Sequence, residues 1–370
     1  MTDWRERITV PRAPFIPPVV WVDDAATGGF SAVSRDDDHV RWHELVEADE
    51  PIITQVDDGR TPPGATGLRP SSSCSKPSLV ADMLDALDVR LGHRVLEIGG
   101  GTGWNAAELA TRVGPRGQIV SIEVDPDVAA AERQALRTGG YDVVVITADG
   151  LAGHAREAPY DRVIGTAAVR AIPRAWIDQA HPRGVIVTPW GTDYCNGTLL
   201  RLDVHDDGSA SGRCGTNLAF MRVRGQRRDY LEPGDDELRG ADRTTTARSI
   251  PEFFEMIAYS RAAFAIGLRV PRCYLTVEEL APDHRRIELH DVSSRSWARV
   301  DLLRRNEIFE VHQIGPRRLW EEVDAAYGWW LDSGRPAPDR FGLTVAENGD
   351  HSAWLDEPGE ASWPLPVAAP

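Results

Sequence analysis

A glycine-rich turn next to an acidic residue is the first feature of this sequence that could do chemistry. The stretch Glu97-Ile-Gly-Gly-Gly-Thr-Gly103 follows an apolar run and precedes one with helical periodicity, which predicts a strand, a turn and a helix. Glycines let the backbone adopt positive φ and pass close to a ligand. Because ligands of open α/β sheets bind at the carboxyl ends of the strands, we expect this turn to contact one.

Acidic residues also end the next two predicted strands. Glu123 closes "SIE", and Asp149 follows "VVVITA". A carboxylate at Glu97 can meet an ammonium group, one at Glu123 can accept two ribose hydroxyls, and Asp149 falls where an adenine amino group would lie. Capping of a helix is the plainer interpretation of Asp149 and of Asp125. The three positions together favour S-adenosylmethionine as cofactor.

A nicotinamide dinucleotide is the alternative ligand. Gly101-x-Gly103-x-x-Ala106 also satisfies the dinucleotide fingerprint, although short glycine patterns recur by chance. Enzymes that bind NAD share an acid at the position of Glu123, so Glu97 is the residue that distinguishes S-adenosylmethionine from NAD. Its carboxylate would repel a pyrophosphate and attract the methionyl ammonium.

The elements that must position these residues alternate between strand and helix from residue 77 to about 225. Strands alternating with helices of this length predict a doubly wound α/β fold of the class I, Rossmann-like methyltransferase type, ending in an antiparallel pair. Residues 1–70 look like an irregular N-terminal extension rich in proline and charge. Residues 226–370 predict an α+β appendage with a closing hairpin about Asn348-Gly349, so the expected divisions are 1–70, 71–225 and 226–370.

Composition excludes several classes of protein. The 370 residues carry a net charge of −16, which argues against a nucleic-acid partner because phosphates need a positive surface. No apolar run approaches the ~18 residues of a membrane span, and no secretory h-region is visible. Four scattered cysteines fit a reducing compartment, so we expect a cytoplasmic protein. His39 and His43 have helical spacing but lack the order of a zinc motif, and no metal is expected.

The run "RVLEIGGGTGWNAAELATRVGPRGQIVSIEVD" and the motifs after it resemble the protein-L-isoaspartate O-methyltransferase family over roughly residues 71–225. The resemblance implies methyl transfer from S-adenosylmethionine to an aspartyl carboxylate of a peptide. It implies that Ser75, in "SSCSKP", is the catalytic residue. The implied cofactor-binding residues are Glu97, Gly99, Gly101, Thr102, Gly103, Glu123, Asp149, Gly150 and Thr166, and the implied substrate-binding residues are Ser73, Lys76, Pro77 and Ala167.

The chain departs from that family in length and in two positions. Ser78 stands where the family has an aromatic residue or histidine, and Trp104 where it commonly has tyrosine. The long flanks resemble an actinobacterial branch that accompanies ATP-grasp ligases and methylates an aspartate of a cyclised ribosomal peptide, which then forms an aspartimide. General isoaspartyl repair and a non-catalytic peptide-binding module remain as alternatives. Without the resemblance, residues 71–78 would be interpreted as a flexible spacer.

Overall fold

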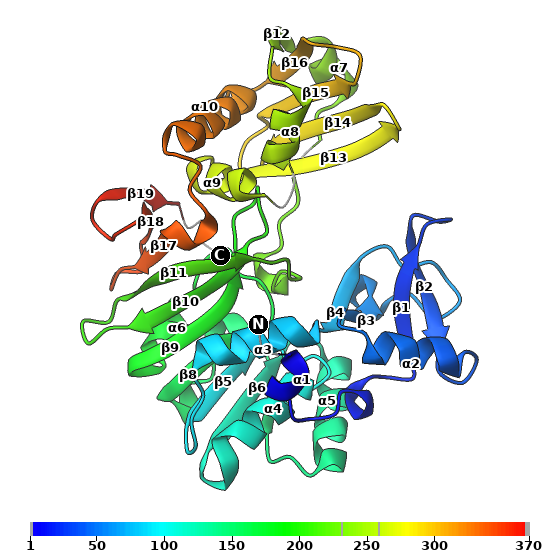
Figure 1. Cartoon of the computed structure of the whole chain (residues 1–370), viewed down its shortest axis with the longest axis vertical. Helices are drawn as coiled ribbons and strands as arrows, with labels where there is room; N and C mark the ends of the chain where they lie inside the picture. The colour runs from blue at the N-terminus through cyan, green and yellow to red at the C-terminus, as the bar shows by residue number, and fades with distance from the viewer. Residues whose placement is uncertain (1–2, 231, 258–259, 367–370) are drawn as a thin grey trace.

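A ten-stranded mixed sheet forms the centre of the molecule in the computed structural model, which describes residues 3–230, 232–257 and 260–366 (Figure 1). The strand order is β19-β18-β17-β11-β10-β9-β8-β5-β6-β7. The strands are β5 (Arg94–Ile98), β6 (Gln118–Glu123), β7 (Val144–Thr147), β8 (Tyr160–Gly165), β9 (Ala180–Trp190), β10 (Thr198–Val204), β11 (Ala210–Asn217), β17 (Phe341–Val345), β18 (His351–Leu355) and β19 (Ala361–Leu365).

Strands β5 to β9 are parallel and carry apolar side chains on both faces. On β5, Val95 belongs to one buried cluster and Leu96 to another, as the two-residue period of a strand requires. The Val95 face is covered by α3 (Pro77–Leu87), α4 (Trp104–Val113) and α5 (Pro126–Gly139), whereas α6 (Arg174–Asp178) packs on the Leu96 face. The predicted doubly wound α/β fold is therefore confirmed, including the antiparallel pair β10–β11.

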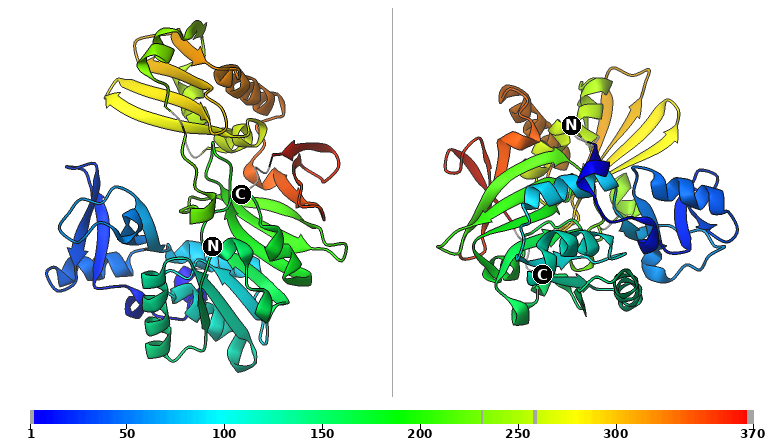
Figure 2. Two further views of the ribbon diagram at one scale, coloured as in Figure 1. Left: turned by 180° about the vertical axis from the view of Figure 1, so that it is seen from behind. Right: turned by 60° about the horizontal axis from the view of Figure 1, so that its bottom comes forward.

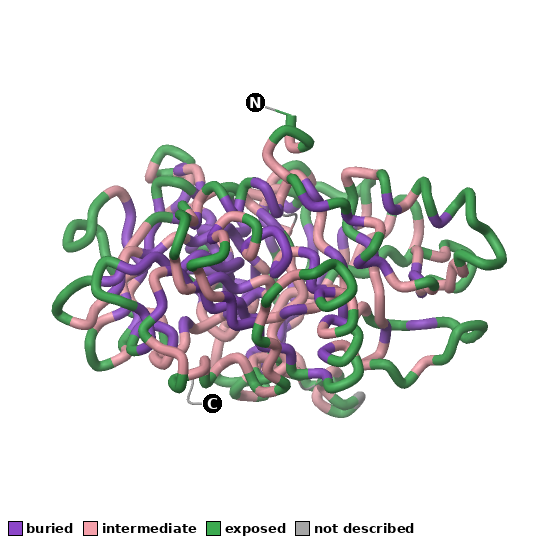
Figure 3. Tube along the Cα trace, turned by 90° about the horizontal axis from the view of Figure 1, so that it is seen from below, coloured by how far each residue is buried: buried purple, intermediate pink, exposed green. Residues whose placement is uncertain are grey.

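The sheet changes direction of growth at β5. The chain passes from β5 to β6 and β7 on one side, and then returns to place β8 and β9 on the other. The carboxyl ends of β5 and β8 meet at this switch point, which is where open α/β sheets bind ligands. Buried residues gather in the middle of the molecule and exposed ones lie around its rim (Figure 3).

The N-terminal residues form a second, four-stranded antiparallel sheet instead of the irregular extension that we expected. Its order is β2-β1-β3-β4, and it lies to one side of the central sheet in every view (Figure 2). "VVWVDD" and "GFSAVS" pair across a turn, and Trp21 and Trp42 are buried. The elements are α1 (Trp4–Arg7), β1 (Val19–Asp24), β2 (Gly29–Ser34), α2 (His39–Glu47), β3 (Ile52–Val56) and β4 (Pro70–Cys74).

The C-terminal residues form a third sheet, of order β12-β16-β15-β14-β13, packed against helices. Residues 258–259, between the helices α8 (Ile250–Ile257) and α9 (Arg261–Arg269), lie outside the described part of the chain. The elements are α7 (Asp235–Arg239), β12 (Asp242–Thr246), α8 (Ile250–Ile257), α9 (Arg261–Arg269), β13 (Cys273–Ala281), β14 (His284–Asp291), β15 (Trp297–Leu303), β16 (Phe309–Ile314) and α10 (Leu319–Asp332).

The expected divisions do not separate the three sheets. Strand β4 begins at Pro70 and falls mostly within the expected 71–225 unit, but it pairs with β3 of the N-terminal sheet. The predicted hairpin about Asn348-Gly349 forms as β17–β18, but β17 pairs with β11 and so extends the central sheet. The fully buried Phe264 of α9 contacts Trp190 and Phe341 edge to face, so one apolar core runs from the central sheet into the C-terminal part.

No helix among the described residues combines the length and apolar character that crossing a membrane requires.

Candidate active site

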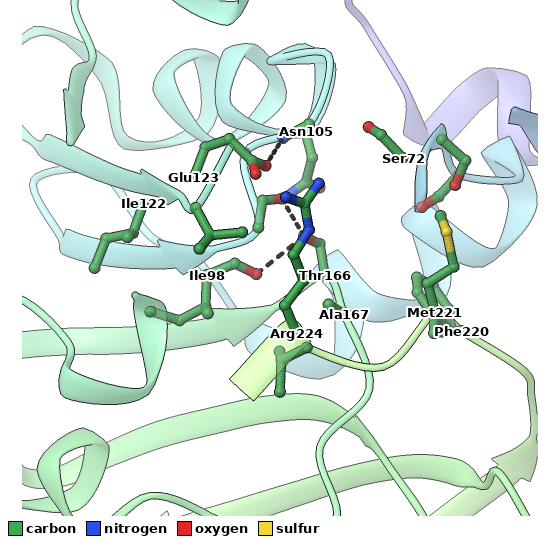
Figure 4. Close-up of a pocket in the computed structure, with 18 of the residues that line it drawn as sticks. Ser72, Ile98, Asn105, Ile122, Glu123, Thr166, Ala167, Phe220, Met221 and Arg224 are labelled. Atoms are coloured by element: carbon green, nitrogen blue, oxygen red, sulfur yellow. Dashed lines mark hydrogen bonds between the residues drawn. The ribbon is translucent and has the colours of Figure 1, made fainter. Parts of the chain in front are cut away.

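A cavity of about 160 Å³ opens at the carboxyl ends of β5, β6 and β8 (Figure 4). The glycine turn forms its floor, and Gly99, Gly101 and Gly103 all have positive φ. A Cβ on Gly99 would come within 2.7 Å of the Thr166 hydroxyl, so this position requires glycine. Thr166 donates its hydroxyl hydrogen to the Ile98 carbonyl at 3.0 Å and also contacts the Gly99 carbonyl. It therefore fixes the shape of the turn from the end of β8.

The carboxylate of Glu123 is held at the cavity wall by two backbone amides. Gly101 N–H donates to Oε2 at 3.0 Å, and Asp125 N–H donates to Oε1 at 2.9 Å. Each carboxylate oxygen retains a further lone pair that can accept a hydrogen bond. Glu123 lines the cavity, so these oxygens can accept hydrogen bonds from a ligand there, and its role toward ribose hydroxyls stays a prediction.

Glu97 lies behind the turn rather than in the cavity, contrary to the contact with an ammonium group that the sequence suggested. Asn105 Nδ2 donates to Oε1 at 2.7 Å and Ser121 Oγ to Oε2 at 2.5 Å. The side chain is completely buried, and this burial raises the pKa of its carboxyl. Asn105 reaches the cavity wall, so Glu97 acts on the site by orienting that amide.

A second buried carboxyl, Glu132 of α5, lies against the turn. A Cβ on Gly100 would clash with its oxygens. Burial raises the pKa of Glu132, and the neighbouring Glu97 carboxylate raises it further. No sequence pattern points to this residue, because it stands in an otherwise ordinary helical run.

Asp149 and Gly150 lie at the end of β7, on the cavity wall. Asp149 accepts a hydrogen bond from Leu151 N–H at 3.0 Å, which is the capping role considered as the plainer interpretation. A Cβ on Gly150 would overlap the side chain of Ile98, so the chain passes close to the end of β5. Both residues line the cavity, and capping leaves Oδ2 of Asp149 available.

The serine-rich segment is an ordered strand, β4, followed by the start of α3. Ser73 and Ser75 line the cavity together with Thr102 and Ala167. Lys76 does not line it, and its ammonium lies 3.7 and 3.8 Å from Asp49 and Glu50. Pro77 is the buried first residue of α3. The segment is therefore no spacer, and only its serine side is placed to contact a substrate.

Arg224 crosses the cavity and was not among the predicted residues. Its guanidinium lies 2.9 Å from Asp125 and 3.2 Å from Asp58, which lies in the turn after β3. Figure 4 shows Glu123, Ile122 and Ile98 on one side of the cavity, with Ser72, Phe220 and Met221 on the other. An arginine shortly after a predicted strand carries no signal by itself, because its contacts come from two distant segments.

The exposed pair His39 and His43 is not joined by a third ligand. Their Nε2 atoms are 3.1 Å apart. Within the described ranges, no group of three or more potential metal-binding side chains occurs.

A glycine turn and a fixed strand-end carboxylate at the switch point of this sheet define a class I methyltransferase. The sequence profile of the protein-L-isoaspartate(D-aspartate) O-methyltransferase family matches residues 64–228. Protein-L-isoaspartate O-methyltransferase 2 of Archaeoglobus fulgidus is 39% identical over 153 residues, which are 41% of this chain and 69% of the relative. The enzyme of Methanopyrus kandleri is 37% identical over 161 residues, 43% and 70% of the two chains.

The chain belongs to the protein-L-isoaspartate O-methyltransferase family. It is an S-adenosylmethionine-dependent carboxyl O-methyltransferase, so the expected cofactor is confirmed. A solved structure of a protein-L-isoaspartate O-methyltransferase covers 94% of this chain and 92% of its own, with a TM-score of 0.51 and 18% identity. That likeness concerns the fold and extends beyond the region that the family profile matches.

Proposed function

We propose that the acceptor is a normal L-aspartate of a constrained, macrocyclic ribosomal peptide, and that the methyl ester closes to an aspartimide. The observation that supports this is the origin of the cavity walls. Strand β4 of the N-terminal sheet and the residue after it contribute Ser71–Ser75, and the segment leading to the C-terminal part contributes Phe220–Gly225 and Arg227. More than half of the chain lies outside the family match. The wall residues lie within the match, but Asp58, which lies outside it, pairs with Arg224 of the wall at 3.2 Å.

The residues of the cavity fit S-adenosylmethionine. Glu123 would hold the ribose, the amides of the glycine turn would face the methionyl part, and Asp149 with Gly150 would border the adenine. The bound cofactor supplies a methyl group activated by its sulfonium. A Cβ on Gly101 would point toward the Ser73 carbonyl on the opposite wall, so glycine at this position leaves room in the cavity for the ligand.

The acceptor needs little activation from the protein. An aspartate has a reference pKa of about 3.9, so it is ionised at neutral pH, and no general base is required. Ser73 and Ser75 would orient the carboxylate by hydrogen bonds, and the apolar wall around Met221 would exclude water. We propose Ser75 as the residue that contacts the acceptor, because it follows the strand that lines the cavity.

Aspartimide formation follows from the chemistry of the ester. The backbone nitrogen of the next residue attacks the ester carbonyl, the C–O bond to the methoxy group breaks, and methanol leaves with the amide proton. The peptide has then lost one water overall. A macrocycle would favour binding because it loses less conformational entropy than a linear peptide. We propose an ATP-grasp ligase, which closes such rings at the expense of ATP, as the enzyme that supplies the substrate.

General isoaspartyl repair is the second candidate. Proteins named protein-L-isoaspartate O-methyltransferase are the relatives of this chain. Repair requires acceptance of many sequences, and the same cavity chemistry would serve it.

Mass spectrometry with isotopically labelled S-adenosylmethionine separates the two candidates. The two acceptors are a cyclised aspartate-containing precursor peptide and an unstructured isoaspartyl peptide. We expect preference for the cyclised peptide and a product lighter by one water. Rapid methylation of the isoaspartyl peptide, without preference for the cyclised one, would establish repair instead.

A further inference from the structure

A second cavity, of about 560 Å³, adjoins the candidate active site and is rich in arginine. The two cavities share Leu151, Gly225 and Arg227 in their linings. Five arginines line the second cavity against a single carboxylate, that of Asp193. They are Arg170, Arg174, Arg227, Arg228 and Arg272.

The walls combine residues of the family match with residues of the C-terminal part. The loop after β8 and the end of β9 form one side, α9 and the turn after it form another, and the linker at 225–228 forms the third. His351 of β18 closes the cavity: its Nε2 accepts from Ile172 N–H at 3.0 Å, while Nδ1 lies 2.9 Å from the Gly349 carbonyl. Burial lowers the pKa of His351, which agrees with a neutral ring that bridges the loop and the closing strands.

Positive charge exceeds negative charge in this cavity. Asp193 is shared between Arg170 and Arg228, the latter at 4.0 Å. Asp58, which lies outside the lining, pairs with Arg227 and also with Arg224. Asp178, also outside the lining, pairs with Arg174. Five guanidinium groups therefore face three carboxylates.

Arg272 is the clearest unsatisfied group. Within the described part of the chain it forms no ion pair, and its buried Nε has no hydrogen-bond partner. A buried donor without a partner is unfavourable, and a guanidinium matches a carboxylate with two parallel hydrogen bonds. The cavity also has the volume of an ordinary ligand pocket, roughly 300–1,000 Å³.

We propose that this cavity binds acidic side chains of the substrate peptide, close in sequence to the residue that is methylated. This inference rests on the proposed peptide acceptor, because the two cavities share a wall and one extended peptide can enter both. The chain as a whole carries a net charge of −16 and repels acidic peptides at long range. A local excess of arginine is what allows an acidic segment to bind, and it gives the C-terminal part a role in selecting substrates.

Two synthetic peptides test the proposal by direct binding. They contain the same central aspartate, flanked by glutamates in one and by glutamines in the other. Fluorescence anisotropy on the full chain with S-adenosylhomocysteine measures their affinities. We expect the acidic peptide to bind at least about tenfold more tightly, since hydrogen bonds between charged groups contribute this much. Equal affinities would overturn the proposal.

Substitutions of the lining arginines test whether the preference for the acidic peptide arises in the second cavity. Arg272→Gln combined with Arg228→Gln should remove most of the preference for the acidic peptide, whereas Arg272→Lys should retain part of it. Arg116→Gln combined with Arg137→Gln is the matched control, because it also removes two positive charges, from exposed positions in the turn before β6 and in the last turn of α5. Unchanged affinity for S-adenosylhomocysteine shows that a variant is folded. A preference that survives in the double variant contradicts the proposal.

The binding readout separates this inference from the proposed function. If the acidic peptide binds selectively but neither peptide is methylated, the cavity assignment stands and the proposed acceptor fails. If methylation proceeds equally on both peptides without selective binding, the acceptor chemistry stands and the cavity assignment fails.

Discussion

Replacing Glu132 by glutamine should make the protein less sensitive to rising pH. The side chain is completely buried beside the glycine turn, and the hydroxyl of the neighbouring Ser121 donates its hydrogen to Glu97 instead of to Glu132. Its raised pKa means that the folded chain keeps a proton which the unfolded chain has released at neutral pH. The stabilising effect of that proton is complete below the ordinary glutamate pKa and is lost as pH rises through the folded pKa.

The size of the effect follows from proton linkage. With one extra proton bound in the folded state, the free energy of unfolding falls by about 1.4 kcal/mol per pH unit above the ordinary glutamate pKa of about 4.3. Glu132→Gln removes this titration, so its advantage over the wild type should grow to roughly 3 kcal/mol between about pH 4.5 and pH 7. An unpaired amide in the variant lowers its stability by the same amount at every pH. The prediction therefore concerns how the free energy of unfolding changes with pH, and not its absolute value.

Urea unfolding across this pH range measures both slopes. Asp127→Asn is the matched control, since it changes an exposed carboxylate to an amide on the same helix. The curves of wild type and Glu132→Gln should diverge with pH, and the control should follow the wild type. Parallel curves for wild type and Glu132→Gln would refute the reasoning, because Glu132 would then be ionised in the folded chain.

Three further predictions concern the site and the sheet. Glu123→Ala should weaken binding of S-adenosylhomocysteine by about 1.5–3 kcal/mol, as measured by calorimetry, because hydrogen bonds to a charged group contribute this much; an affinity within a factor of about two would contradict the assigned role. Ser75→Ala should lower turnover about tenfold with unchanged cofactor affinity, since Ser75 lines the cavity and we propose that it contacts the acceptor rather than the cofactor; wild-type turnover would remove Ser75 from the site. A chain ending at Arg340 should aggregate, as size-exclusion chromatography can show. It lacks the fully buried Phe341, Leu343 and Val345, each contributing about 1.5–3 kcal/mol, and a monomeric product would contradict this.

The periodic elements of the fold could be predicted from the sequence, but their partners could not. The hairpin about Asn348-Gly349 follows from local turn chemistry, whereas its pairing with β11 depends on contacts far apart in the chain. The N-terminal sheet was missed because proline and charge between its strands obscured two short alternating runs. In such short runs, periodicity is a weak signal.

The same distinction applies to the site. Glu97 and Glu123 both end strands, and sequence spacing treats them alike. In the structure their positions differ. Ser121 and Asn105 donate hydrogen bonds to the Glu97 carboxylate behind the turn, whereas backbone amides hold the Glu123 carboxylate at the cavity wall. Arg224 owes its position to Asp58 and Asp125, which no local pattern connects with it.

The pairing of β17 with β11 also bears on how the protein is made. Ala210 pairs with Val345, so the central sheet cannot gain its last three strands until nearly the whole chain has left the ribosome. Until then β11 presents an open edge, which is a template for pairing with other chains. Contacts between such distant residues slow folding. The third sheet, which is synthesised in between, can fold first and bring the closing strands back to β11, so its position in the gene determines the order in which the enzyme is assembled.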